Sequence, residues 1–190
     1  MGMTVKRRRD ADLASVLMHK VADIRGGVSV AVSDLGGDWL REGAVLSAPV
    51  NGLCHVVKYA KVVAEVAAAG KAINVAKGHN FKVGDYVMAA TQAKAYAITS
   101  ISTTNKEYDV LNVGTALGAI SKGAFVMEAK EESADTASAL RYTPCAVVGT
   151  GKPVIAGENL DTDAWVIAVT KGNGMPATIA TALKGVINID

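Results

Sequence analysis

A short pattern that occurs three times constrains the fold of this 190-residue chain more than any other feature. In each copy a residue is followed by Gly, then by a small or acidic residue and an apolar run. The copies lie at 42–46, 83–88 and 122–127. They are about 40 residues apart, a period at which repeated β units are worth testing. Because the match is short, we interpret it as a recurring turn that starts a strand. The Gly residues that the backbone would then require are Gly43, Gly84 and Gly123.

The second copy ends a longer stretch, 73–88, that is typical of strand, turn and strand. Ile73 and Val75 alternate with polar or small neighbours, the period-two pattern of a half-buried strand. Residues 77–80 read Lys-Gly-His-Asn, a turn composition. The stretch therefore predicts a central hairpin.

Composition favours a β-rich protein. Half of the residues are apolar, mostly Ala and Val, while only 5% are aromatic. Val suits a pleated surface, and the 19 Gly residues suit turns. Further strands are predicted at 95–101 and 108–113, on either side of a polar loop. Strands at such even spacing indicate an all-β fold, mainly β with one or two short helices, arranged as a small sandwich or barrel.

We expect three regions along the chain. Residues 1–45 form an N-terminal arm, residues 46–130 a β domain with the central hairpin, and residues 131–190 a second strand group packed on the first. Within the arm, an acidic cap is expected to start a short helix that runs to Asp23, and a strand follows at 28–32. The expected cap is Asp10 or Asp12, and the apolar stripe of this helix is Leu13, Val16, Leu17 and Val21.

Two segments allow more than one structure. In 54–66, Lys58, Lys61 and Glu65 have helical spacing, but the many Val residues favour a strand. The charged, Ala/Ser-rich stretch 128–139 is either a linker or one short helix at 133–140 with Ser133 as its cap. The second strand group is predicted to have strands at 145–148, 152–156, 164–170 and 186–189, with turns at 161–163 and 172–176.

The formal net charge is only +2, so we expect no strong electrostatic field around the molecule as a whole. The run Lys6-Arg7-Arg8-Arg9 is the exception. A solvated tail is its simpler interpretation, contact with nucleic acid or an acidic protein surface is the alternative, and we do not expect nucleic acid as a partner. No apolar run reaches the roughly 18 residues of a membrane span, and the start lacks the usual signal-peptide pattern. We therefore expect a protein made in the cytoplasm, with no membrane partner.

No cofactor or metal site is predicted. Gly149-Thr150-Gly151-Lys152 lacks the other residues of a phosphate-binding loop, because Ala146 and Pro153 occupy the required positions. Cys54 and Cys145 are distant in sequence and have no CxxC partner, so neither a disulfide framework nor a zinc site follows.

We expect no enzymatic activity. His19, His55 and His79 lie in no metal-binding pattern, and we interpret His79 as an exposed turn residue. Cys54 and His55 are adjacent, so on a strand they point to opposite faces, which disfavours a nucleophile pair.

Asp85 and Asp109 would be a carboxylate pair if the fold brought them together. The bend after Gly84 gives Asp85 a simpler, structural role. An enzyme with a dispersed site stays as an alternative, and its carriers would be His55, His79, Asp85 and Asp109.

The segments 77–87, 97–101 and 122–126 resemble the head fibre and head decoration proteins of tailed bacteriophages and their prophage relatives. The order of residues 30–35 and 40–43 is also similar to the way such proteins begin. The resemblance covers roughly residues 28–129. It implies a non-enzymatic virion protein on the capsid exterior, commonly a homotrimer, that binds the major capsid protein through its N-terminal region. A compact knob fits this length better than a long fibre.

A β-barrel module that recognises a carbohydrate or a host surface is the alternative function. Such a module needs an exposed aromatic patch, for which Trp39, Trp165 and a few Tyr are available. Trp165 lies between Ala164 and Val166 and is expected in the core.

Overall fold

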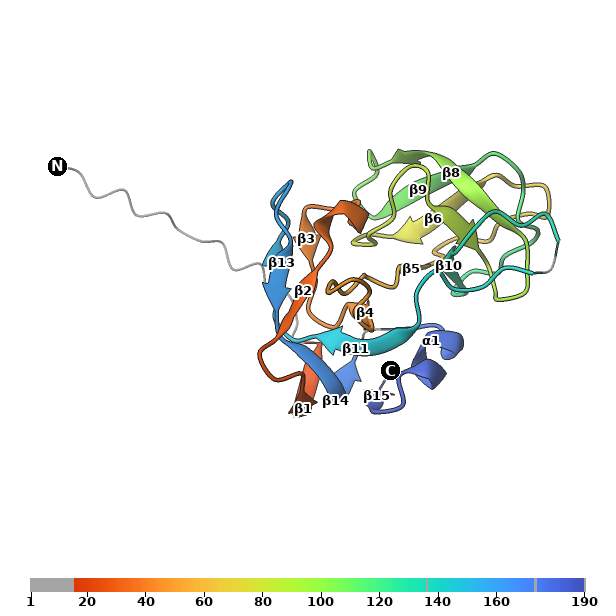
Figure 1. The fold of residues 1–190 in the computed structure, drawn as a ribbon. Coiled ribbons are helices and arrows are strands. Elements are labelled where there is room, and N and C mark those ends of the chain that lie inside the picture. Colours follow the sequence, from red (N-terminus) through yellow and green to blue (C-terminus); the bar gives the residue numbers. More distant parts are fainter. Residues whose placement is uncertain (1–15, 136, 173, 190) are drawn as a thin grey trace.

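The computed structural model describes residues 16–135, 137–172 and 174–189, and it confirms the all-β prediction (Figure 1). Most strands belong to two large sheets. The first has five strands: β1 (Leu17–Asp23), β14 (Ala164–Lys171), β11 (Pro144–Val148) and β4 (Val45–Ser47) in that order, with β15 (Val186–Ile189) also paired to β14. The second has six, in the order β5 (Tyr59–Lys61), β10 (Phe125–Ala129), β7 (Tyr86–Met88), β8 (Ala95–Ser102), β9 (Tyr108–Val113) and β6 (Ala72–Ala76).

The first sheet is built from the two ends of the described chain. β1 and β4 come from the N-terminal part, and β11, β14 and β15 come from the C-terminal part. Two small antiparallel pairs join the same regions: β2 (Val28–Val30) with β13 (Leu160–Thr162), and β3 (Trp39–Leu40) with β12 (Lys152–Pro153). Residues 16–45 are therefore part of a shared sheet structure instead of a separate arm. The basic run and the expected helix cap at Asp10 or Asp12 lie outside the described residues.

The predicted helix up to Asp23 is wrong over its described part. Leu17–Asp23 is strand β1 and pairs antiparallel with β14, with three register shifts along its length. Backbone hydrogen bonding to a distant strand has overridden the short helical stripe, which had no surface on which a helix could pack.

The predicted central hairpin is also wrong. β6 pairs with β9 at one edge of the second sheet, whereas β7 lies between β10 and β8. The strands are present, but the nine residues between them contain a second turn that redirects the chain to another place in the sheet.

The recurring turn is confirmed as a structural device. Gly43, Gly84 and Gly123 have φ angles of 76°, 94° and 88°, in the region that favours glycine. The residue after each Gly donates its N–H to the carbonyl three residues back, at 3.1 to 3.2 Å, and a strand starts one residue later. Each Gly N–H in turn donates to a neighbouring segment: to Val148, Ile98 and Val62, respectively. The device therefore ties each new strand to the sheet.

The ambiguous segment 54–66 is extended, as the Val content favoured. It contains β5, and Val56, Val62 and Val66 make isolated bridges to other extended segments. Residues 133–135 and 137–140 are not helical, and Ser133 bridges to Ala95. The expected turn at 161–163 is wrong, because most of it belongs to β13.

A short helix after the expected turn at 172–176 was not predicted. α1 (Ala177–Ala182) connects β14 to β15, which run parallel, as a crossover connection requires. Ile179 and Leu183 from this connection are buried in the same core as Val147 and Ala168 of the first sheet. The helix side of β14 and β15 is thus covered. A further 3-10 turn lies at Val32–Asp34.

Three hydrophobic cores hold the elements together. The first joins the two sheets, because it contains Val147 and Ala168 of the first and Met88 and Met127 of the second. The second core is built by side chains from the six-stranded sheet and its connections. The third core is built by side chains from β2, β3, β4, β11 and β13 and the segments beside them. Figure 1 shows the sheet of β6, β8 and β9 at the opposite end of the molecule from β1, β14 and β15.

We predict that Gly84→Ala lowers the free energy of unfolding by about 1–2 kcal/mol, because an L-residue is strained at this positive φ. A Cβ at Gly84 would meet no atom within 4 Å, so backbone strain alone is tested. Gly114→Ala is the matched control, because its Cβ would make only an ordinary contact at 3.7 Å and its φ is not positive. Urea unfolding of both variants checks the prediction, and equal stabilities would contradict it.

Candidate functional site

Charged side chains from three adjacent strand segments meet inside the second sheet. Lys58 directly precedes β5, Glu128 lies in β10, and Asp85 directly precedes β7. The Nζ atom of Lys58 lies 2.7 Å from Oδ2 of Asp85 and 3.2 Å from Oε1 of Glu128. The Lys58 side chain is 0% exposed and each carboxylate only 2%. We name Lys58, Asp85, Glu128 and Arg141 the buried charge cluster.

Arg141 completes this cluster from the first segment after the second sheet. Its Nη1 donates to Oε1 of Glu128 at 2.9 Å and lies 4.0 Å from Oδ1 of Asp85. The backbone N–H of Lys82 donates to Oδ2 of Asp85 at 2.9 Å. The buried charge cluster thus pairs two cations with two carboxylates, which is the condition for keeping ions inside a fold.

Glu128 is the member whose protonation the surroundings alter most clearly. Burial raises the pKa of Glu128, Asp85 adds to the rise, and Lys58 and Arg141 oppose it. Its Oε2 atom is buried and has no hydrogen-bond partner within the described part of the chain. Glu128 therefore holds a proton at higher pH than an exposed glutamate, and it has an oxygen free to carry one.

The structure places the two expected carboxylates in different ion pairs. Asp85 belongs to the buried charge cluster, as described. Asp109 accepts from Nζ of Lys77 at 2.6 Å and lies 3.4 Å from Nε2 of His79. Asp85 also accepts from its own turn, as the sequence indicated.

The interpretation of His79 as an exposed turn residue is wrong, because its side chain is only 6% exposed. Its Nδ1 atom accepts the backbone N–H of Phe81 at 3.2 Å. Burial lowers the pKa of His79, Lys77 and Arg41 contribute to the lowering, and Asp109 opposes it. The fold therefore favours the neutral imidazole.

The side chains of Cys54 and His55 lie in separate environments. His55 stacks on Tyr142, with ring centroids 4.3 Å apart, and its Nδ1 bonds to Oδ2 of Asp34. Cys54 is a free thiol buried in the third core, where burial and the neighbouring Cys145 raise its pKa. Both features oppose a thiolate activated by His55.

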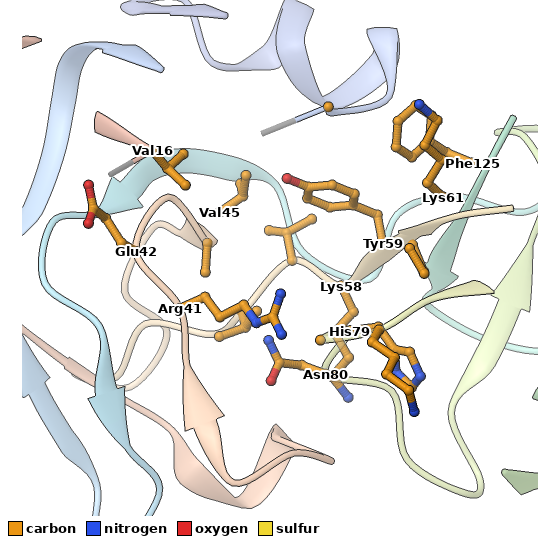
Figure 2. Close-up of a pocket in the computed structure, with 18 of the residues that line it drawn as sticks. Val16, Arg41, Glu42, Val45, Lys58, Tyr59, Lys61, His79, Asn80 and Phe125 are labelled. Carbon is orange, nitrogen blue, oxygen red and sulfur yellow. The ribbon is translucent and has the colours of Figure 1, made fainter. Parts of the chain in front are cut away.

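A cavity of about 360 Å³ opens beside the buried charge cluster. Figure 2 shows Arg41, Asn80 and His79 at one end and Tyr59 and Phe125 at the other. The Arg41 guanidinium packs so closely on Gly78 that a Cβ there would lie 1.8 Å from Cζ. The charged lining residues are Arg41, Lys58, Lys61, Lys77 and Glu42, but Lys58 and Lys77 are already paired with carboxylates.

The outward face of β14 and β15 is apolar and exposed. Ile167 is 45% exposed on β14, and Ile187 and Ile189 are 64% and 49% exposed on β15. Val169 pairs in register with Ile187, so it lies on the same face, between Ile167 and Lys171. Because α1 covers the other side, this face is left open as far as the described residues go. We name Ile167, Val169, Ile187 and Ile189 the outer apolar face.

The tryptophans do not form an exposed platform. Trp39 has its Nε1 atom buried. Trp165 is partly buried against the first core, as expected, and its Nε1 donates to Asp163 at 2.8 Å. Lys20 covers the Trp165 ring, with Nζ 5.3 Å from the centroid. This arrangement gives little support to stacking on a sugar.

Among the described residues, no group of three or more His, Cys, Asp and Glu side chains is placed to hold a metal ion. Over the same residues no helix has the length and apolar character needed to span a membrane. The chain matches no family model, no curated protein and no solved structure.

The sequence reasoning missed Lys58, Glu128 and Arg141 as a cluster. The available signal was a charge in the middle of an apolar extended run, at Lys58 and at Glu128. Such a charge must have a partner if the strand is buried. The identity of the partner depends on strand order.

We predict that Asp85→Ala lowers the free energy of unfolding by about 3–5 kcal/mol, because it leaves the buried Lys58 ammonium short of a partner. Asp38→Ala, at an exposed carboxylate, is the control and should change stability by no more than about 0.5 kcal/mol. Denaturant unfolding measures both. A mild effect at Asp85 would show that the buried charge cluster is not a major source of stability.

We also predict that His79 makes the fold sensitive to acid. Because its folded-state pKa is lowered, its contribution to stability is present above its unfolded value, about 6.5, and is lost as the pH falls through the folded value. Between pH 7 and pH 5, His79→Gln should therefore lose less stability than the unaltered protein. His19→Gln, at an exposed position of β1, should follow the unaltered protein. Parallel pH profiles for all three would refute the prediction.

Proposed function

We propose that this protein is a non-enzymatic structural protein of a bacteriophage capsid, placed on the capsid exterior and bound to the major capsid protein. The proposal begins from the resemblance of residues 28–129 to head fibre and head decoration proteins. The three Gly turns that carry much of this resemblance do start strands β4, β7 and β10, so the pattern reflects a real architectural device.

The outer apolar face is the observation that carries the proposal. Large exposed apolar side chains on two adjacent strands are typical of a surface that another protein covers. The face lies on β14, which pairs with β1, the first described strand, and on β15, which pairs with β14. The resemblance implies that the N-terminal region docks on the shell, so both features favour a contact at this side of the first sheet.

The side chains that were candidates for an enzyme site are engaged in contacts with other side chains, which supports a structural role. His55 is engaged by Asp34 and Tyr142, and Asp109 is engaged by Lys77. These contacts are of the kind that hold a fold together. We further propose a homotrimer, as the resemblance implies.

Binding to shells tests the proposal. Capsids that lack this protein are mixed with the full chain and sedimented, and its bound fraction is measured across a concentration series. The variant Ile187→Asp/Ile189→Asp should bind at least about tenfold more weakly, because a charge in an apolar contact loses burial and gains desolvation cost. Ile155→Asp is the control, because Ile155 is 52% exposed and lies in the connection between β12 and β13, outside β14 and β15.

Two further measurements complete the test. Removing residues 1–15 should also weaken binding, whereas a deletion to residue 45 would remove strands β1 to β3 and is not informative. Light scattering of the full chain should give the mass of a trimer. A monomer without affinity for shells would overturn the proposal.

A further inference from the structure

The buried charge cluster holds an amine, a carboxyl group and a proton carrier in a reactive arrangement. Nζ of Lys58 lies 2.7 Å from Oδ2 of Asp85, so the amine is held against the carboxyl group whose Cγ it would attack. Glu128 comes from β10, which lies between β5 and β7. Its backbone N–H donates to the Lys58 carbonyl at 2.9 Å, and it pairs in register with Val87, two residues after Asp85. The three side chains therefore come from three neighbouring segments of one sheet.

These three side chains are almost fully buried, 0% exposed for Lys58 and 2% for each carboxylate, although the neighbouring Arg141 side chain is 36% exposed. Residues two apart in an extended segment point to the same face of a sheet. The charged side chains therefore share a face with the apolar residue two positions away: Ala60 for Lys58, Val87 for Asp85 and Val126 for Glu128. Those three apolar residues belong to the second hydrophobic core. In such a site, proton transfer from an ammonium to a carboxylate removes two costly charges and leaves a neutral, nucleophilic amine.

From this geometry we infer that Lys58 and Asp85 form an intramolecular isopeptide bond, with Glu128 as the acid–base group. The Nζ lone pair attacks Cγ of the protonated Asp85, and the new C–N bond forms. Glu128 takes a proton from the nitrogen and returns it to the departing oxygen. The C–O bond then breaks and one water molecule leaves. The step needs no oxidant, reductant or co-reactant.

The contacts distinguish the roles of the two carboxylates. Oδ2 of Asp85 accepts the backbone N–H of Lys82, which stabilises negative charge on that oxygen during attack. Oε1 of Glu128 is held by Arg141, whereas its Oε2 is buried and has no hydrogen-bond partner among the described residues. The oxygen that faces Nζ of Lys58, at 3.2 Å, is Oε1, so this oxygen is the one placed to take the proton from the nitrogen. Burial raises the pKa of Glu128, which supports this role.

The remaining charges are balanced after the reaction. The amide removes the ammonium of Lys58 and the carboxylate of Asp85 together. Arg141 and Glu128 then remain as a hydrogen-bonded ion pair. The bond would tie the segment before β5 to the segment before β7 across β10, and it would restrict the unfolded chain as a disulfide does. Such a bond would suit an exposed virion protein, but the inference does not depend on the proposed function.

Mass spectrometry of the denatured full chain tests the inference. The unaltered protein should be lighter than its sequence by one water molecule, and digestion should release a branched peptide joining Lys58 to Asp85. Lys58→Met and Glu128→Gln should restore the full sequence mass. Lys61→Met is the control, because Lys61 is exposed at the end of β5, three residues after Lys58, and this variant should keep the water loss.

Separate peptides containing unmodified Lys58 and Asp85, from folded protein at its full sequence mass, would overturn the inference. The branched peptide is sought in the unaltered protein, so this outcome does not depend on whether a variant folds. Water loss that persists in Lys58→Met would likewise overturn it, because another site would then be the source. Water loss that persists in Glu128→Gln would overturn the role of Glu128.

Discussion

The contact of the buried Lys58 Nζ with the carboxyl groups of Asp85 and Glu128 is the interaction on which the second sheet depends. A fully buried charge is tolerated only where its partners are held in place, and here the partners come from Asp85 and Glu128 on neighbouring segments. The order of β5, β10 and β7 brings the three side chains within reach of one another. Arg141 extends the same pairing to the chain that enters the first sheet.

The first sheet differs from the second in having one apolar side exposed. It gathers strands from both ends of the described chain, and α1 covers one side of β14 and β15. The other side is left with the outer apolar face, which the chain itself does not cover within its described part. A protein that uses the second sheet as its stable body and the first as its contact surface would suit a role in a larger assembly.

Local features were predicted well from the sequence. Most predicted strands in 72–113 and 144–189 are present, and the Gly turns have the backbone geometry that the pattern indicated. The errors occurred where a short segment had two local solutions. Leu17–Asp23 has a helical stripe but pairs as a strand, and β6 and β7 are joined by a turn yet have other partners. The helix α1 was missed because its residues form no long periodic pattern.

At the candidate site, too, local contacts were predicted from the sequence and contacts between distant residues were not. Asp85 was noticed for its turn, and its hydrogen bond with Lys82 follows from local geometry. Its ion pair with Lys58 joins residues 27 positions apart. His79 looked exposed because it follows a turn, but Asp109 and the packing of Phe81 enclose it.

The sequence by itself determined where the chain turns, which stretches are extended, and that the protein is mainly β. These properties follow from the φ preference of glycine and from the alternation of apolar residues, both of which act within a few positions. Only the tertiary structure decided which strands are neighbours, which charges meet, and which apolar face stays open. Those outcomes depend on burial and on hydrogen bonding between distant segments, and no short pattern contains that information.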